Sequence, residues 1–165
     1  MLSVKKMINN YENITYKSII LFSSYLSFIL FYLSYDITLS PDFEKYVKYF
    51  DYYNSDSTKT GLEQGNYYFF LSYVFTIIIQ YFNNNLTINE LINFSLHLSN
   101  NLIYLIGIFG FYKLLVLKKF NKFSSFLILV ISIFLPAAII LRLTFKPEVF
   151  VFALLGWFLY FIEKF

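Results

Sequence analysis

The chain has 165 residues, of which 58% are hydrophobic, 24% aromatic and 14% charged, whereas soluble domains carry about 25% charged residues. It contains no cysteine, which excludes disulfides, thiolate catalysis and cysteine-based metal sites. The net charge is +3, and the lysines are distributed among separate loops rather than gathered into one basic face, so nothing supports nucleic-acid binding.

Five apolar runs follow one another along the chain. They lie at 18–35, 67–82, 91–112, 123–141 and 149–162. A helix needs about 20 apolar residues to cross a bilayer core. The pattern therefore predicts an all-α, multi-pass integral membrane protein.

The placement of lysines orients the first run, because Lys and Arg stay on the cytoplasmic side. Three lysines within residues 1–17 precede it, which predicts a cytoplasmic N-terminus and a transmembrane helix at 18–35. An outer-face loop is expected at 36–90. Between 36 and 66 it carries six acids against three lysines, a lysine deficit typical of the outer face.

A second basic cluster, expected on the cytoplasmic side, decides which of the next two apolar runs crosses the bilayer. It consists of Lys113, Lys118, Lys119 and Lys122. If both 67–82 and 91–112 crossed, parity would place this cluster outside. The run "YYFFLSYVFTIIIQYF" is rich in interfacial tyrosines, so we expect 67–82 to lie as an amphipathic helix in the outer interface. About four transmembrane helices are then predicted in total, including the one at 18–35. The other three are a transmembrane helix at 91–112, one at 123–141 and one at 149–162, separated by the basic cytoplasmic loop 113–122 and the outer-face loop 142–148.

A second interfacial helix is expected at about 41–53, in "SPDFEKYVKYFDYYN". Ser40 and Pro41 form a favourable helix start. Asp42 and Glu44 fall in the first turn, where the helix dipole favours negative charge. Apolar and aromatic residues at spacings of three and four form one face, and charged residues form the other. The acids of this helix could serve only solubility. Alternatively, Asp42, which is expected close to the membrane surface, could have a catalytic role, and the pattern leaves both open.

The stretch "LRLTFKPE" places Arg142, Lys146 and Glu148 directly after a long apolar run. Ionisable groups at the edge of a membrane bundle are costly unless they are paired. Arg142 and Lys146 suit a phosphate, Arg142 through its bidentate guanidinium. For Lys146, snorkelling to the interface is an equal alternative.

A polar stripe runs along the apolar segment 91–112. Asn93, His97, Asn100 and Asn101 follow an i, i+4, i+7, i+8 spacing and share one helix face. Hydrogen bonding between helices is the main interpretation, and a substrate contact for His97 is the alternative. A lone histidine without further ligands predicts no metal site.

These residues and motifs resemble the GT-C membrane glycosyltransferases, which use polyprenyl-phosphate sugars and include protein mannosyltransferase and aminoarabinose transferase relatives. "SPDFEKY" resembles the acidic motif of their first outer loop, and "LEQGNYYFFLSYVF" the interfacial stretch that follows it. "NFSLHLSNNLIYLIGIFGFYKLL" looks like their next span, and "RLTFKPEVFVFALLGW" like their second outer loop. The chain departs from the family where Phe43 separates Asp42 from Glu44, and where His97 stands in place of a common Arg.

The resemblance implies transfer of a sugar from a polyprenyl-phosphate donor to an acceptor in envelope glycan synthesis, in the bacterial inner (cytoplasmic) membrane. Asp42 would be the general base, and Glu148 the second catalytic carboxylate. The substrate-binding residues would be Glu44, His97, Arg142 and Lys146. No obligatory metal or other cofactor is expected, although two outer-face carboxylates leave a divalent cation open.

Members of this family have many more spans than four, so the chain is expected to be the N-terminal portion of such an enzyme. Its partners would be the lipid bilayer, the lipid-linked sugar donor and further transmembrane helices from a partner chain. The alternatives are a non-catalytic small membrane subunit or scaffold, and a fragment of a polysaccharide polymerase or export protein.

Overall fold

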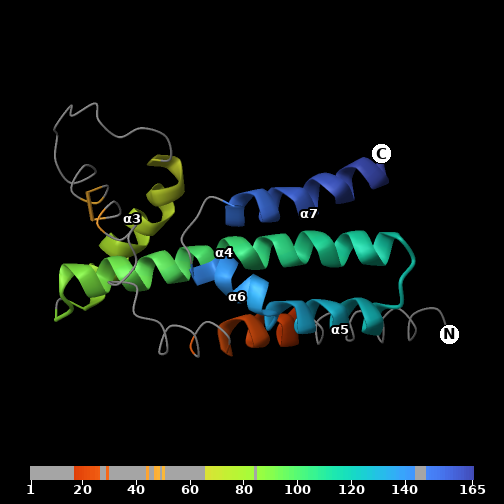
Figure 1. The fold of residues 1–165 in the computed structure, drawn as a ribbon, viewed down its shortest axis with the longest axis horizontal. Coiled ribbons are helices and arrows are strands. Elements are labelled where there is room, and N and C mark those ends of the chain that lie inside the picture. The colour runs from red at the N-terminus through yellow and green to blue at the C-terminus, as the bar shows by residue number, and fades with distance from the viewer. Residues whose placement is uncertain are drawn as a thin grey trace.

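The computed structural model describes residues 17–26, 29, 44, 47, 48, 50, 66–83, 85–143 and 148–165. Within these residues the regular structure is entirely α-helical, as predicted. After a helical segment at 17–26 come α3 (Asn66–Phe82), α4 (Ile88–Leu117), α5 (Lys122–Ile133), α6 (Pro136–Leu143) and α7 (Glu148–Lys164). Figure 1 shows α4 as the central helix, with α7 along one side and α5 and α6 along the other.

Helix α4 is the spine of the bundle. A capping box fixes its start, because Thr87 Oγ1 accepts from the Glu90 N–H at 3.3 Å while Glu90 Oε2 accepts from the Thr87 N–H at 2.8 Å. Its 30 residues extend over roughly 45 Å. Among the helices in the described residues, α4 is the one whose length and apolar composition suffice to cross a membrane by itself.

The apolar run that we predicted as one transmembrane helix at 123–141 forms two helices. α5 ends at Ile133 and α6 begins at Pro136, with a bend of 62° between them. Proline has no N–H and its ring clashes with the preceding turn, so a helix breaks there. Together the two helices have the apolar length of a second membrane span, either broken or re-entrant. Four transmembrane helices therefore remain a prediction.

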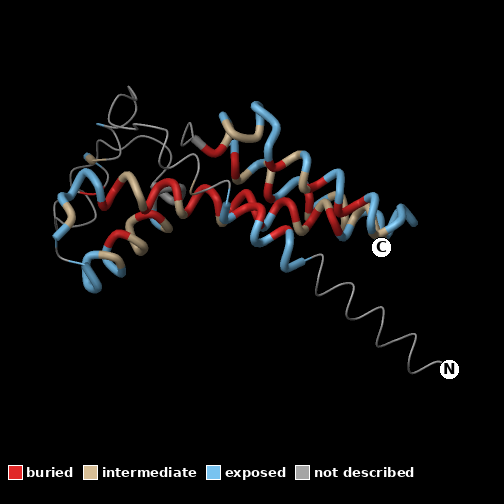
Figure 2. The backbone as a smooth tube through the Cα atoms, turned by 90° about the horizontal axis from the view of Figure 1, so that it is seen from below, coloured by how far each residue is buried: buried red, intermediate tan, exposed pale blue. Residues whose placement is uncertain are grey.

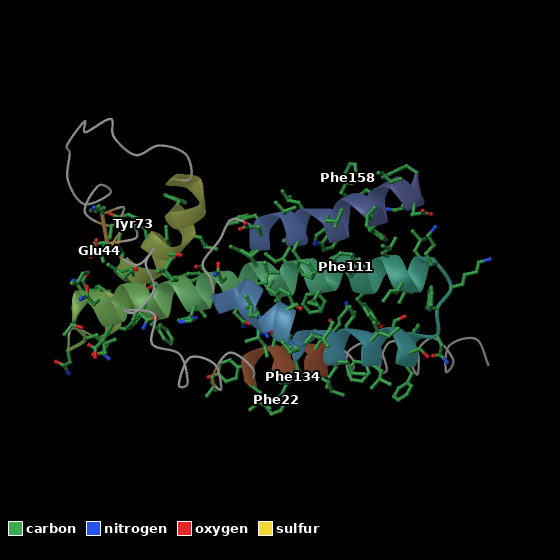
Figure 3. The ribbon with its side chains drawn as sticks, in the orientation of Figure 1. Phe22, Glu44, Tyr73, Phe111, Phe134 and Phe158 are labelled. Carbon is green, nitrogen blue, oxygen red and sulfur yellow. The ribbon has the colours of Figure 1, made fainter. Side chains whose placement is uncertain are left out.

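Helix α7 runs along α4 and turns a large apolar face outward. Val151, Leu154 and Phe158 are 64%, 68% and 62% exposed. In Figure 3 Phe158 points away from α4, whereas Phe111 lies between the two helices. Figure 2 shows the same division, with buried residues following α4 and exposed ones on the outer helices. This distribution suits a helix whose outer side faces lipid or another apolar surface.

Glycines allow α4 and α7 to approach closely. A Cβ on Gly110 would lie 2.8 Å from the Gly156 carbonyl carbon, and a Cβ on Gly156 would lie 2.8 Å from the Gly107 carbonyl oxygen. Trp157 Nε1–H donates to the Ile106 carbonyl at 2.9 Å, which fixes the register of the two helices. Small residues at a close helix crossing are typical of packing within membranes.

Of the two helices predicted in the outer-face loop, the structure describes one along its whole length and the other at four residues only. The helix expected at 67–82 is present as α3. Within the helix expected at about 41–53, the described residues are all helical, namely Glu44, Val47, Lys48 and Phe50. The two charged ones are exposed, whereas Phe50 is 5% exposed and its ring lies 5.7 Å from that of Tyr73 in α3. These positions agree with an amphipathic helix that packs on α3.

Candidate functional site

Polar side chains from three helices meet beside α4. We name them the polar cluster: Ser24, Asn100, Asn101, Tyr104 and Arg142. Asn101 Oδ1 accepts from Ser24 Oγ at 3.2 Å and from Arg142 Nη1 at 3.3 Å, and Asn100 Nδ2 donates to the Arg142 carbonyl at 2.9 Å. All five residues are buried. Because a buried polar group is costly unless it is hydrogen-bonded, these bonds tie α6 and the helix at 17–26 to one stretch of α4.

Arg142 also holds the break between α5 and α6. Its Nη2 donates to the Ile133 carbonyl at 2.5 Å and its Nε to the Ala138 carbonyl at 3.1 Å. The guanidinium carbon lies 4.9 Å from the centre of the Tyr104 ring, and the Tyr104 hydroxyl donates to the Ser132 carbonyl at 3.4 Å. A guanidinium presents five N–H donors. One side chain thus joins the last turn of α5, the body of α6 and the side of α4.

A hydroxyl pair docks α3 on the same helix. Ser72 Oγ and Ser99 Oγ lie 2.5 Å apart, and both residues are buried. Thr76 Oγ1 donates to the Ser72 carbonyl at 2.9 Å, so its hydroxyl is satisfied within α3. α4 therefore collects polar contacts from α3, α6 and the helix at 17–26.

Two of the four residues in the polar stripe predicted on α4, Asn100 and Asn101, make hydrogen bonds between helices. Asn100 and Asn101 bond to Arg142 across the helix interface, which confirms the prediction of interhelical hydrogen bonding for these two residues. His97 is 4% exposed, so it lies inside the bundle on α4. Its contact with a substrate remains a prediction.

The charged candidate residues lie in different environments. Arg142 is 5% exposed and belongs to the polar cluster. Glu148 is exposed in the first turn of α7, and Glu44 is an exposed helical residue that precedes α3 in the chain. Two further candidates lie outside the described residues, Asp42 and Lys146. Among the residues that the structure describes, no three His, Asp or Glu side chains gather where they could hold a metal ion.

Several residues of the site carried no individual signal in the sequence. Ser24, Ser72 and Ser99 are buried at helix contacts, and Tyr104 packs under the Arg142 guanidinium. Serines inside apolar helices are frequent at helix–helix interfaces in membranes, so their positions within apolar runs were the available signal. Which helices they join depends on the packing.

Comparison of the chain with protein-family models, with curated proteins and with solved structures finds no match.

Proposed function

We propose that this chain forms the N-terminal membrane portion of a glycosyltransferase that moves a sugar from a polyprenyl-phosphate donor to an acceptor in envelope glycan synthesis. The observation that carries the proposal is the attachment of Arg142 to α4. These bonds hold the end of α6 on α4, and Glu148 is exposed at the start of α7.

The positions of the lysines support the topology that this function needs. Lys17, Lys113 and Lys122 line one cavity, so the helix at 17–26 begins, α4 ends and α5 begins at one end of the bundle. Lys118 at the end of α4 is paired with Glu163 near the end of α7. The positive-inside rule assigns this end to the cytoplasm. The proposed topology has four crossings, with α3 remaining at the outer side.

The proposed chemistry divides the work between the two outer segments. Asp42 accepts the proton of the acceptor hydroxyl as general base, and Glu148 orients the substrate. Because Arg142 donates to carbonyls of α5 and α6 and to Asn101, its role in the proposal is to position the outer segment. Lys146 then stabilises the departing lipid phosphate.

Sugar transfer by the native full-length protein tests the proposal directly. Membranes containing each variant are supplied with polyprenyl-phosphate sugars, and transfer to endogenous acceptor is measured. Asp42→Asn should lower the rate by about 100- to 10,000-fold, which is the usual contribution of a positioned acid or base. Glu148→Gln should lower it by about 100-fold, because the substrate is no longer held in the reactive orientation. Glu163→Gln, an exposed carboxylate at the other end of α7, is the matched control and should keep wild-type activity. Equal activity in all three variants would refute the assignment.

The topology is tested separately. Since the chain has no native cysteine, single cysteines at Asp51 and Lys119 report the side on which each residue lies. An impermeant thiol reagent should label position 51 in intact cells and should leave position 119 protected. Labelling at both positions would contradict the interfacial placement of α3.

One observation favours a second candidate, a non-catalytic membrane subunit. The outward face of α7, with Val151, Leu154 and Phe158, is wide and apolar, and such a face suits a helix of a partner chain as well as lipid. On this alternative, Glu148→Gln leaves the activity of the assembled complex unchanged. Phe158→Ala instead lowers the yield of the complex.

A further inference from the structure

A cavity of about 650 Å³ lies at the basic end of the bundle, between the helix at 17–26, α4, α5 and α7. Its volume falls within the range of about 300–1,000 Å³ that is usual for small-molecule and cofactor sites. It lies where α4 ends and α5 begins, whereas the proposed transfer chemistry uses the opposite side of the bundle. The cavity therefore needs an explanation of its own.

The charged residues in the described lining of the cavity are all lysines. Three lysines line it, Lys17 from the first helix, Lys113 from α4 and Lys122 from α5, and the described lining includes no acidic residue. The nearby carboxylate of Glu163 is paired with Lys118, which is not among the lining residues. Lysine ammonium groups donate charge-assisted hydrogen bonds to phosphate oxygens. The described lining therefore suits an anion.

Aromatic side chains line the cavity beside the lysines. The Lys113 ammonium lies 5.1 Å from the centre of the Trp157 ring and 5.7 Å from that of Tyr160, within the range of cation–π attraction. Since Trp157 Nε1–H is bonded to the Ile106 carbonyl, Trp157 offers the cavity its ring rather than its N–H. Lysines combined with Trp and Tyr are typical of the membrane–water interface.

We propose that this cavity binds the phosphate headgroup of an anionic phospholipid from the leaflet at the basic end of the bundle. Basic pockets between transmembrane helices on the cytoplasmic side are suited to phospholipid headgroups. Leu117 lines the cavity, and Phe120 and Phe123, which lie within two residues of Lys122 in the sequence, are 52% and 54% exposed. These apolar side chains offer surface to the acyl chains. The inference goes beyond the proposed sugar transfer and does not depend on it.

The single tryptophan of the chain provides the test, because Trp157 lies in the cavity wall. The full chain is placed in bilayers of phosphatidylcholine, and a fraction of the lipid is exchanged for brominated phosphatidylglycerol or brominated phosphatidylcholine, whose bromines quench nearby tryptophan. Quenching by the anionic lipid should saturate at a lower mole fraction than quenching by the neutral one. Replacing Lys17, Lys113 and Lys122 with Gln should weaken the anionic preference about fivefold for each lysine removed, and roughly 100-fold together.

Controls separate a site from general surface charge. The double variant Lys119→Gln, Lys164→Gln removes two charges at the same end, outside the cavity lining, and leaves the Lys118–Glu163 pair intact, so it should keep the wild-type preference. Lys113→Gln, Lys122→Gln is the matched double variant within the lining. Lys→Arg at the three lining positions retains the charge and should keep it too, which distinguishes lost binding from failed folding. Equal quenching by both lipids in the wild type, or equal loss in both double variants, overturns the proposal. Relief of quenching by millimolar inorganic phosphate would assign the cavity to a free anion and overturn the lipid assignment.

Discussion

Adding volume at Gly110 tests whether α4 and α7 are held together by close backbone contact. Gly110→Val places a Cβ that would lie 2.8 Å from both the Gly156 carbonyl carbon and the Trp157 backbone nitrogen. Ordinary carbon contacts lie at about 3.5–4.0 Å. The neighbouring atoms are backbone, which cannot rotate aside as a flexible side chain can. α7 must therefore move away from α4.

The expected cost combines two effects. Overpacking a tight contact costs typically about 1–3 kcal/mol. Displacement of α7 also breaks the 2.9 Å hydrogen bond from Trp157 to the Ile106 carbonyl, and a hydrogen bond contributes about 1 kcal/mol. The free energy of unfolding should fall by about 2–4 kcal/mol in total. Ala137→Leu adds three carbons, as Gly110→Val does, but at an exposed position on α6, and should change stability by less than about 0.5 kcal/mol.

Unfolding by sodium dodecyl sulfate in mild detergent, followed by the fluorescence of Trp157, measures both variants. The Gly110→Val protein should unfold at lower dodecyl sulfate, and the emission of Trp157 in its folded state should move toward that of an exposed indole. Unfolding midpoints that coincide for wild type, Gly110→Val and Ala137→Leu would refute the close-contact interface between α4 and α7.

Two further predictions concern the centre of α4 and its start. Asn101→Leu removes the acceptor of an Arg142 donor and should lower the free energy of unfolding by about 1–3 kcal/mol, because a buried donor is left unsatisfied. Asn85→Leu, at an exposed position, is the control. Equal stability of the two variants would contradict the polar cluster. Thr87→Ala removes the hydroxyl that caps the Glu90 N–H and should cost about 1 kcal/mol. The same fluorescence titration measures it, and an unchanged midpoint would show that the capping box does not stabilise the fold.

Much of the helical architecture was predictable because apolar runs and caps are local properties. The run predicted at 91–112 became α4, extended to Ile88 and Leu117. The run at 149–162 became α7 with small changes at both ends. The break in the run at 123–141 could have been read from Pro136, whose missing N–H is a property of one residue. The 62° bend and its stabilisation by Arg142 could not be predicted from the sequence.

The candidate site shows the same division. The stripe of Asn and His residues on one face of 91–112 follows from helical periodicity, and hydrogen bonding between helices was the expected use. The partners of that stripe are far along the chain, since Ser24 and Arg142 reach Asn101 from opposite sides in sequence. A periodic pattern specifies a face and leaves open what lies against it.

The sequence by itself determined that the chain is helical and strongly apolar, and that its lysines fall into clusters before the first run and around the end of the third. Only the tertiary structure decided that Lys17, Lys113 and Lys122 line one cavity, and that Gly110 and Gly156 meet. The physical reason is range. Hydropathy, capping and proline effects act within a few residues of the chain, whereas backbone contact between helices and the convergence of charges arise only when distant segments pack together.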